Sequence, residues 1–288
     1  MISYKYLSAA ILFCFLSPLA LSQKYSVHKK KHSYIEATGG INFSLPFVSE
    51  QYAVLNTIGS KYDEDYLKEY EKMKSNLGMQ FGIRYSYSFT NSISVISGFG
   101  YQTQSINYRS HYSWSDTLYL QNFEREMHHA QKISYFTLPI LVRWDFSRHQ
   151  FMPYAQAGLY FNFRHQAQKE ILYDNTIDGE KTSNQTSSSG VVPLTNHIKK
   201  FNMGVRAGIG LNYYTKFATF GIESSFNYGF FDIVNNEERY ADHTGFALSY
   251  LDVLDQFKLS HINVQLLVAI PINHSVKLNI LRRSRYYR

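Results

Sequence analysis

Long stretches of the chain alternate apolar residues with small or polar ones. The clearest is 77–89, whose odd positions are aromatic, aliphatic or methionine and whose even positions are glycine, glutamine, arginine or serine. Side chains two residues apart share one face of a β-strand, so this segment has one apolar and one polar face. A soluble sheet can show the same pattern, so the length and repetition of the segments decide the fold class.

Eight segments share this alternation, and most are about 12 to 16 residues long. Strands of soluble domains usually have about 5 or 6 residues, whereas a tilted transmembrane strand needs roughly 9 to 11. The pattern predicts an all-β fold, an eight-stranded antiparallel up-and-down transmembrane β-barrel over residues 33–273. The predicted strands are 34–45, 77–89, 93–108, 133–146, 153–165, 201–213, 217–230 and 259–272.

The connections between these segments alternate between long and short. Three are turns of a few residues, and four are long, namely 46–76, 109–132, 166–200 and 232–258. Outer-membrane barrels have short periplasmic turns and long extracellular loops, and an even number of strands places both termini in the periplasm. Aromatic residues gather near both ends of the strands, as in the girdles of such barrels.

The first residues have the features of an export signal. Lys5 precedes a mostly apolar run over 9–21, and Ala20-Leu21-Ser22 places small residues at the positions that a signal peptidase requires. We therefore expect residues 1–22 to be a cleaved signal peptide, with an uncleaved anchor helix as the alternative. Cys14, the only cysteine, lies inside this segment. The mature protein would then have no disulfide, zinc–thiolate site or thiol nucleophile.

The net charge of +7 comes from the two ends of the chain. Residues 23–32 and 274–288 are basic, whereas 32–273 hold 19 basic and 22 acidic side chains, a balance of −3. A nucleic-acid-binding protein needs a basic patch on its folded surface, so we expect no nucleic-acid partner. We expect two periplasmic tails, and the second is either solvated or bound to anionic lipid, peptidoglycan or a periplasmic protein. Its basic residues are Lys277, Arg282, Arg283, Arg285 and Arg288.

The faces predicted to line the lumen carry charges of both signs. The interior of an eight-stranded barrel is just wide enough for side chains to fill it, and unpaired buried charges are costly. We expect these side chains to form a structural network of ion pairs and hydrogen bonds that plugs the lumen; a narrow conducting path is the alternative. They are Glu36, Arg84, Arg143, Asp145, Arg164, Arg206 and Glu223.

The sequence contains no motif of a familiar enzyme or cofactor site. G-x-S-x-G, H-E-x-x-H, P-loop and dinucleotide-binding patterns are absent. His111, His128 and His129 fall in the second long loop without ligand spacing, so we expect solvated histidines and no metal or cofactor. A Ser-His-Asp set has no weight without geometry in a chain this rich in serine. In the first loop, the charge pattern and apolar spacing of 63–75 indicate a short helix.

Three predicted strands resemble one known family. The segment Ile133–Trp144 (ISYFTLPILVRW), then 153–158 (PYAQAG) and 204–210 (GVRAGIG), is similar to strands of the PorT-like outer-membrane β-barrel family of Bacteroidetes. The resemblance implies a barrel scaffold of varied roles, whose namesake takes part in type IX protein secretion. Unlike typical outer-membrane strands, the chain does not end on a terminal aromatic but continues to Arg288.

Together these features predict a non-enzymatic outer-membrane protein with a structural or interaction role. Its partners would be outer-membrane lipid and periplasmic or secretion-system proteins reached through tails or loops. A small pore for ions or solutes is the alternative, and a lipid-modifying barrel enzyme is a remote one. The oligomeric state stays open.

Overall fold

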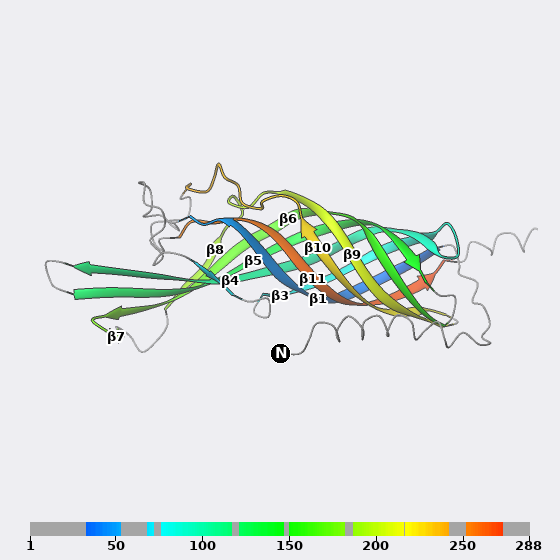
Figure 1. Cartoon of the computed structure of the whole chain (residues 1–288), viewed down its shortest axis with the longest axis horizontal. Coiled ribbons are helices and arrows are strands. Elements are labelled where there is room, and N and C mark those ends of the chain that lie inside the picture. Colours follow the sequence, from blue (N-terminus) through cyan, green and yellow to red (C-terminus); the bar gives the residue numbers. More distant parts are fainter. Residues whose placement is uncertain are drawn as a thin grey trace, which may run out of the picture.

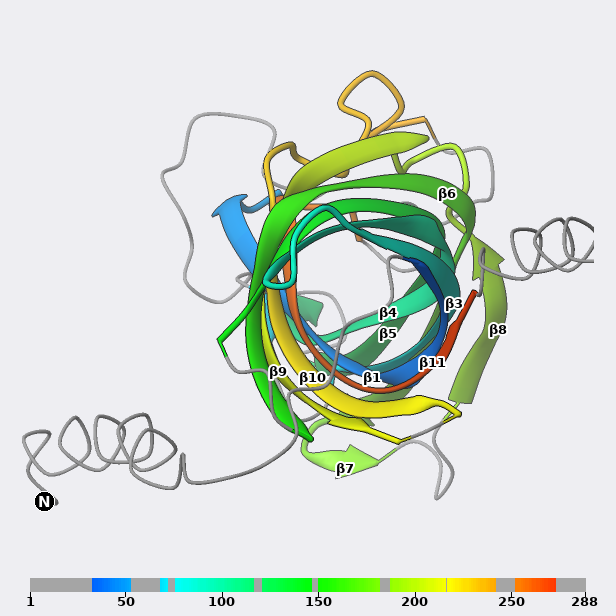
Figure 2. The same cartoon turned by 90° about the vertical axis from the view of Figure 1, so that its right-hand side faces the viewer.

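The computed structural model describes residues 33–52, 68–71, 76–116, 121–146, 150–181, 187–215, 217–241 and 252–272. Eight long strands form one closed antiparallel ring, in which β1 pairs with both β3 and β11 (Figures 1 and 2). The predicted eight-stranded barrel is confirmed. Among the described residues, no helix is long and apolar enough to cross a membrane. The ring consists of β1 (Ser33–Glu50), β3 (Leu77–Ser88), β4 (Ile93–Asp116), β5 (Gln121–Asp145), β6 (Phe151–Ile177), β9 (Phe201–Tyr214), β10 (Thr219–Gly229) and β11 (Gln256–Pro271).

The outer surface of the barrel is apolar over a limited height. On β3, Met79, Phe81 and Ile83 are 60–68% exposed, while Gln80 between them is buried and Gly82 has no side chain. On β5, the outward residues are apolar from Phe136 to Phe146, about 34 Å along a strand, which a tilt of about 40° reduces to about 26 Å. This height matches the apolar band of outer-membrane barrels, so the lipid-facing surface follows from the alternation in the sequence.

Strands β4, β5 and β6 are much longer than predicted. They are paired from Asp116↔Gln121 down to the opposite end of the barrel, and they run on together beyond the apolar band (Figure 1). Much of 109–132 and part of 166–200, predicted as loops, are therefore strand. Beyond Phe136 the outward positions of β5 become polar or charged, including Lys132, His128 and Glu126. We call this sheet, residues 105–116, 121–133 and 166–177, the strand extension.

Three short strands attach to the edges of the strand extension. β2 (Glu69–Tyr70) pairs with β4, whereas β7 (Glu180–Lys181) and β8 (Ser187–Pro193) pair with β6. The helix predicted over 63–75 is wrong at β2, where pairing with Tyr108 and Arg109 overrides the local helical spacing. The rest of that segment lies largely outside the described residues.

A bulge changes the parity of β6 where it leaves the barrel. Tyr135 pairs with Arg164 but Ser134 pairs with Gln166, so His165 is an extra residue in the ladder. Even-numbered residues such as Asn162 are buried before the bulge, and odd-numbered residues such as Lys169 are buried after it. A one-residue insertion in one strand exchanges its two faces, so the bulge decides which side chains of β6 enter the mouth of the barrel.

The lumen is filled in layers that the inward residues of β11 follow in order. From the short-turn end these residues are apolar (Ala269, Leu267), then polar (Gln265 to His261), then apolar again towards the long-loop end, and all are buried. The first apolar layer also contains Tyr34, Met152 and Tyr214. Side chains therefore occupy the lumen along its length, as expected for eight strands.

Candidate functional site

Two glutamates and two arginines form a network across the middle of the lumen. Arg84 lies 3.0 Å from Glu36 and 3.2 Å from Glu223, and Arg143 lies 3.0 Å from Glu36. All four side chains are at most 4% exposed. Because they come from β1, β3, β5 and β10, the network joins strands that are not all neighbours in the wall. We call these four residues the lumen network.

Neutral side chains complete the lumen network. The Tyr154 hydroxyl donates to Glu223 Oε2 at 3.0 Å, and Gln265 Nε2 donates to Glu223 Oε1 at 2.7 Å. Gln80 Nε2 in turn donates to Gln265 Oε1 at 2.9 Å. The Arg143 guanidinium also lies 4.2 Å from the centre of the Tyr154 ring. A buried ion pair offsets its desolvation cost only when its remaining lone pairs accept hydrogen bonds. The bonds from Tyr154 and Gln265 fill this need at the carboxylate of Glu223.

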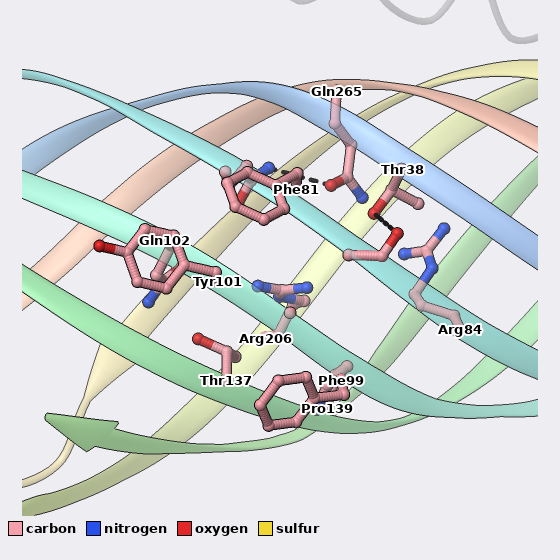
Figure 3. Close-up of a pocket in the computed structure, with 13 residues that line it drawn as sticks. Thr38, Phe81, Arg84, Phe99, Tyr101, Gln102, Thr137, Pro139, Arg206 and Gln265 are labelled. Atoms are coloured by element: carbon pink, nitrogen blue, oxygen red, sulfur yellow. Dashed lines mark hydrogen bonds between the residues drawn. The ribbon is translucent and has the colours of Figure 1, made fainter. Parts of the chain in front are cut away.

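A small cavity lies beside the lumen network, towards the long-loop end. Its volume is about 30 Å³, enough for about two water molecules. The Arg206 guanidinium points into it, together with the side chains of Gln102 and Thr137 (Figure 3). Room for the cavity comes from Gly82 and Gly100, which carry no side chain on its wall.

The backbone ladder next to this cavity is interrupted. β4 pairs with β5 at Ser97↔Ile140 and again at Gly100↔Thr137, but the two positions between them are unpaired. Pro139, which has no N–H to donate, occupies this gap and lines the cavity.

Two of the charged residues predicted to line the lumen lie outside the lumen network. Asp145 is buried near the short-turn end, where it pairs with Tyr154 in the ladder. Arg164 sits at the bulge, is only partly buried, and donates to the backbone carbonyls of Thr195 and Ile198. The prediction of one common lumen network is therefore wrong for Arg164, because the bulge turns that position towards the 194–198 segment.

An apolar core closes the long-loop end of the barrel. Segments that the sequence predicts as loops fold over the mouth and bury aliphatic and aromatic side chains against the strands. Each buried side chain of this kind contributes about 1.5–3 kcal/mol, so the core is a substantial closure. We call it the mouth core. It consists of Ile106, Tyr108, Ile133, Tyr135, Ala167, Leu194, Ile198, Ile233, Val234, Leu254, Phe257 and Leu259.

Charged side chains are buried at the edge of the mouth core. Asp252 lies 3.0 Å from Lys68 and also pairs with Lys169, while Asp255 lies 2.9 Å from Lys68. The hydroxyl of Tyr108 donates to Asp252 Oδ2 at 2.9 Å. We call these five residues the mouth cluster. It joins β4, β6 and segments before β2 and β11, which are far apart in the sequence.

The pKa values of the mouth cluster reflect this pairing. Burial alone would raise the pKa of Asp252, but the ammonium groups of Lys169 and Lys68 lower it below its ordinary range. Burial would lower the pKa of Lys68, yet Asp252 and Asp255 raise it. For the neighbouring His129, burial and then Lys169 lower the pKa well below 6.5. At neutral pH Asp252 is thus ionised and Lys68 protonated, and the neighbouring His129 is neutral.

Ser110, His129 and Asp252 lie next to one another in space in the serine–histidine–aspartate arrangement of a hydrolase triad. Ser110 Oγ lies 2.7 Å from His129 Nε2, but His129 Nδ1 lies 3.6 Å from Asp252 Oδ2, beyond hydrogen-bond range. The three residues are at most 2% exposed. Asp252 already binds two ammonium groups, and the His129 ring stacks on Tyr108 at 4.5 Å. The geometry fits a packed structural group better than an accessible nucleophile.

The predicted solvated histidines divide into two kinds. His111 is exposed and His128 is partly exposed, whereas His129 is buried and bonded, which corrects the prediction for that residue. Among the described residues, no group of three acids, histidines or cysteines could hold a metal ion. The predicted signal peptide 1–22, segment 23–32 and basic tail 274–288 lie outside the described residues.

Sequence reasoning missed the mouth cluster. Lys68, Lys169, Asp252 and Asp255 lie in predicted loops, and Tyr108 is the last residue of a predicted strand. One signal was available: Asp252 and Asp255 interrupt an otherwise apolar run, YLDVLDQF. Acids in such a run are either exposed at a surface or buried with partners, and only the fold distinguishes the two.

Several solved outer-membrane proteins are weakly similar to the chain. The structures similar to the chain include the outer membrane protein OprG from Pseudomonas aeruginosa, with 13% identity, 86% of this chain and 100% of that chain covered, and a TM-score of 0.40. Neisserial surface protein A shows 12% identity, 83% and 97% coverage, and a TM-score of 0.33. The outer membrane enzyme PagL shows 10% identity, 83% and 99% coverage, and a TM-score of 0.29. No curated protein matches the chain significantly.

These likenesses are low in both identity and TM-score, and the family of the chain rests on a different match. The family model described as the outer membrane protein beta-barrel domain matches residues 22–235, well over half of the chain. Its match includes most of the barrel strands and the whole strand extension. The chain therefore belongs to the outer membrane protein beta-barrel domain family and is an outer-membrane β-barrel protein.

Proposed function

We propose that this protein is a non-enzymatic, non-conducting outer-membrane barrel that presents the strand extension to a partner protein. The observation that carries the proposal is the double closure of the lumen. The lumen network crosses the barrel near its middle, and the mouth core seals the long-loop end. A pore needs a continuous hydrated path, which two packed layers oppose.

The strand extension is the feature suited to contact a partner. It is a paired sheet, so it holds its shape better than a loop of the same length. Beyond Phe136, β5 continues for about 15 residues, or roughly 50 Å of strand. The outward side chains of the strand extension include Glu126 on β5, 52% exposed, and Arg109 on β4, 51% exposed. A rigid polar surface of this kind suits protein contact better than lipid contact.

The proposed orientation follows the loop lengths. We place the short turns and both termini in the periplasm and the strand extension outside the cell. The residues 1–22 would be removed on export, which leaves the basic tail beyond 273 free to bind anionic lipid, peptidoglycan or a periplasmic protein.

The resemblance to the PorT-like barrels of Bacteroidetes supports a narrower version of this role. It favours an accessory of protein secretion or surface attachment. The resemblance rests on three strand motifs, all of which are barrel strands in the structure. Such motifs describe the scaffold, so the partner has to come from experiment.

Conductance tests the closed lumen. Purified full-length protein in planar bilayers is expected to give no steady single-channel openings. Insertion is verified in the same preparation by heat-modifiable gel mobility, which a folded barrel shows and an unfolded chain does not. Steady, ion-selective openings would contradict the closed lumen and favour a small pore.

Site-specific crosslinking tests the contact surface. A photo-crosslinking residue at Glu126, on the strand extension, is expected to capture a protein in intact cells. The matched control at Ile83, on the lipid-facing side of β3, is expected to capture none. Equal protein capture at both positions, or none at Glu126 with a well-folded barrel, would oppose the proposal.

A further inference from the structure

Arg206 is a buried cation for which the barrel supplies no acid. Its side chain is in the lumen on β9 and its residue is 5% exposed, yet no carboxylate oxygen of the described residues lies within 4 Å of it. Its hydrogen bond within those residues runs from Nε to Asn227 Oδ1. The two terminal nitrogens of the guanidinium are left to face the cavity of Figure 3.

The nearby acids are already engaged. Glu36 binds Arg84 and Arg143, and Glu223 binds Arg84, Tyr154 and Gln265. The ladder places Arg206 level with Gly158 and Leu141. Asp145 is four residues further along β5, or about 13 Å. Three arginines thus share this level of the lumen with two glutamates, a local excess of one positive charge, while the charge of Asp145, nearer the short-turn end, acts on Arg143.

This excess charge needs compensation. An arginine stays protonated in proteins, so Arg206 cannot become neutral on burial. A buried charge without a partner costs several kcal/mol, whereas one that meets an opposite charge in a low-dielectric interior recovers much of that cost. The walls of the cavity add the side-chain amides of Gln80, Gln102 and Gln265, each of which has one N–H left after its bond to Gln265, Asn162 or Glu223.

We propose that the cavity beside Arg206 binds one small monovalent anion of the halide class. The volume of about 30 Å³ admits an ion little larger than a water molecule but excludes a phosphate ester or a lipid headgroup. The anion balances Arg206 in the way that the two glutamates balance Arg84 and Arg143. It would fix the β9 wall of the lumen to the β4–β5 wall at the level of the ladder gap.

Anion-dependent stability tests the site. Full-length refolded protein in detergent is heated in sodium chloride, sodium bromide or sodium gluconate at equal ionic strength, and the loss of folded gel mobility is followed. Chloride and bromide are expected to raise the midpoint temperature by several degrees over gluconate, with a saturable concentration dependence. Gluconate is too large for the cavity. Equal midpoints in all three salts would overturn the proposal.

Variants assign the effect to this cavity. Arg206→Gln is expected to abolish the difference between halide and gluconate, whereas Arg164→Gln, which removes an arginine outside the lumen, is expected to retain it. Gly100→Ala keeps Arg206 but places a methyl group on the cavity wall, 3.1 Å from Phe81 O, and is expected to weaken halide binding at least tenfold. A full halide effect in Arg206→Gln would refute the assignment.

A direct readout remains if Arg206→Gln does not fold. Crystals of the unaltered protein grown in bromide are expected to show an anomalous peak beside the Arg206 guanidinium. A peak elsewhere only, or none at saturating bromide, would mean that water alone fills the cavity and would overturn the site.

Discussion

Arg84 and Glu223 form an ion pair of 3.2 Å across the lumen, although β1 and β11 separate their strands along the wall. Backbone hydrogen bonds join only neighbouring strands of a barrel. The pair therefore adds a constraint that the ladder cannot supply, and it holds the cross-section of the lumen at one level. Its energetic value depends on both partners, because either one alone would be a buried charge.

Replacing Arg84 with methionine is expected to lower the free energy of unfolding by about 3–5 kcal/mol, because Glu36 and Glu223 both lose a buried cation. The measurement is urea unfolding in detergent, followed by gel mobility. Lys132→Met, at an exposed position of the strand extension, is the matched control and is expected to change stability by less than about 0.5 kcal/mol. A similar loss in both variants would show that the lumen network contributes little.

The mouth cluster is expected to depend on Asp252 more than on its other acid. Asp252→Asn leaves Lys68 and Lys169 with one carboxylate between them, Asp255, and should cost about 3–5 kcal/mol at the mouth while leaving the barrel folded. Amide hydrogen exchange around 68–71 and 252–255 is expected to accelerate at least a hundredfold. Unchanged exchange there would mean that the mouth core alone holds these segments.

Acid is expected to loosen the mouth in two steps. His129 has a folded pKa below 6.5, so its contribution is present above pH 6.5 and is lost as the pH falls below that value. Asp252 has a folded pKa below 3.8, so its contribution is lost as the pH falls below about 3.8. Both changes have the same sign. The protection factors at 252–255, which correct for the intrinsic pH dependence of exchange, should therefore begin to fall below pH 6.5 and fall again below about pH 3.8.

A histidine variant separates the two steps. His129 faces Ser110 and Tyr108 on β4, Lys169 on β6, and Lys68 and Asp252 from the loops. His129→Gln can still bond to Ser110 but cannot titrate, so the first step, which begins below pH 6.5, should disappear. The partly exposed His128→Gln should retain it. If both variants retain the step, another group is responsible.

Ser110 is expected not to act as a nucleophile. Labelling with a fluorophosphonate probe should leave Ser110 unmodified at neutral pH, because it is 2% exposed and its histidine lacks an orienting hydrogen bond to Asp252. Ser110→Ala should cost only about 1 kcal/mol of stability, from the lost bond to His129. Stoichiometric labelling that the alanine variant abolishes would contradict the non-enzymatic proposal.

The sequence predicted the barrel well where lipid imposes a pattern. Between the aromatic ends, one face of each strand meets lipid and the other meets the lumen, so alternation reports both the strand and its orientation. The predicted start of β3 at Leu77 and of β4 at Ile93 agree with the structure. The same parity correctly turned Arg84 and Glu223 inward, because the ladder is regular at those positions.

Outside the lipid-facing band, the alternation of apolar and polar residues no longer predicts the strands. The strand extension has water on one side, so polar residues occur on both faces of 109–116 and 121–132, and the segments looked like loops. Pairing with neighbouring strands, a long-range property, makes them strands. Arg206 was placed in the lumen from parity, but its missing acid depends on the relative heights of Glu36 and Glu223, which alternation does not report.

The bulge at His165 provides a final test of how the mouth is built. Deleting His165 should leave a regular ladder in which Arg164 and Gln166 follow one another opposite Tyr135 and Ser134. The pairing of Lys169 with Gln131 is kept, so Lys169 should still point inward to Asp252. We expect both the barrel and the mouth cluster to form, because the strand keeps its register on either side of the deletion.

Cysteine accessibility measures which face each side chain occupies. Cys14 lies in the predicted signal peptide, so Lys169→Cys would place the one reactive thiol in the mature chain. This buried position should react with a maleimide slowly both with and without His165. Glu170→Cys, an exposed neighbour, should react quickly in both backgrounds. If the deletion makes Lys169→Cys react at least a hundredfold faster, β6 has changed its register beyond the bulge, and pairing with β5 does not determine which side chains close the mouth.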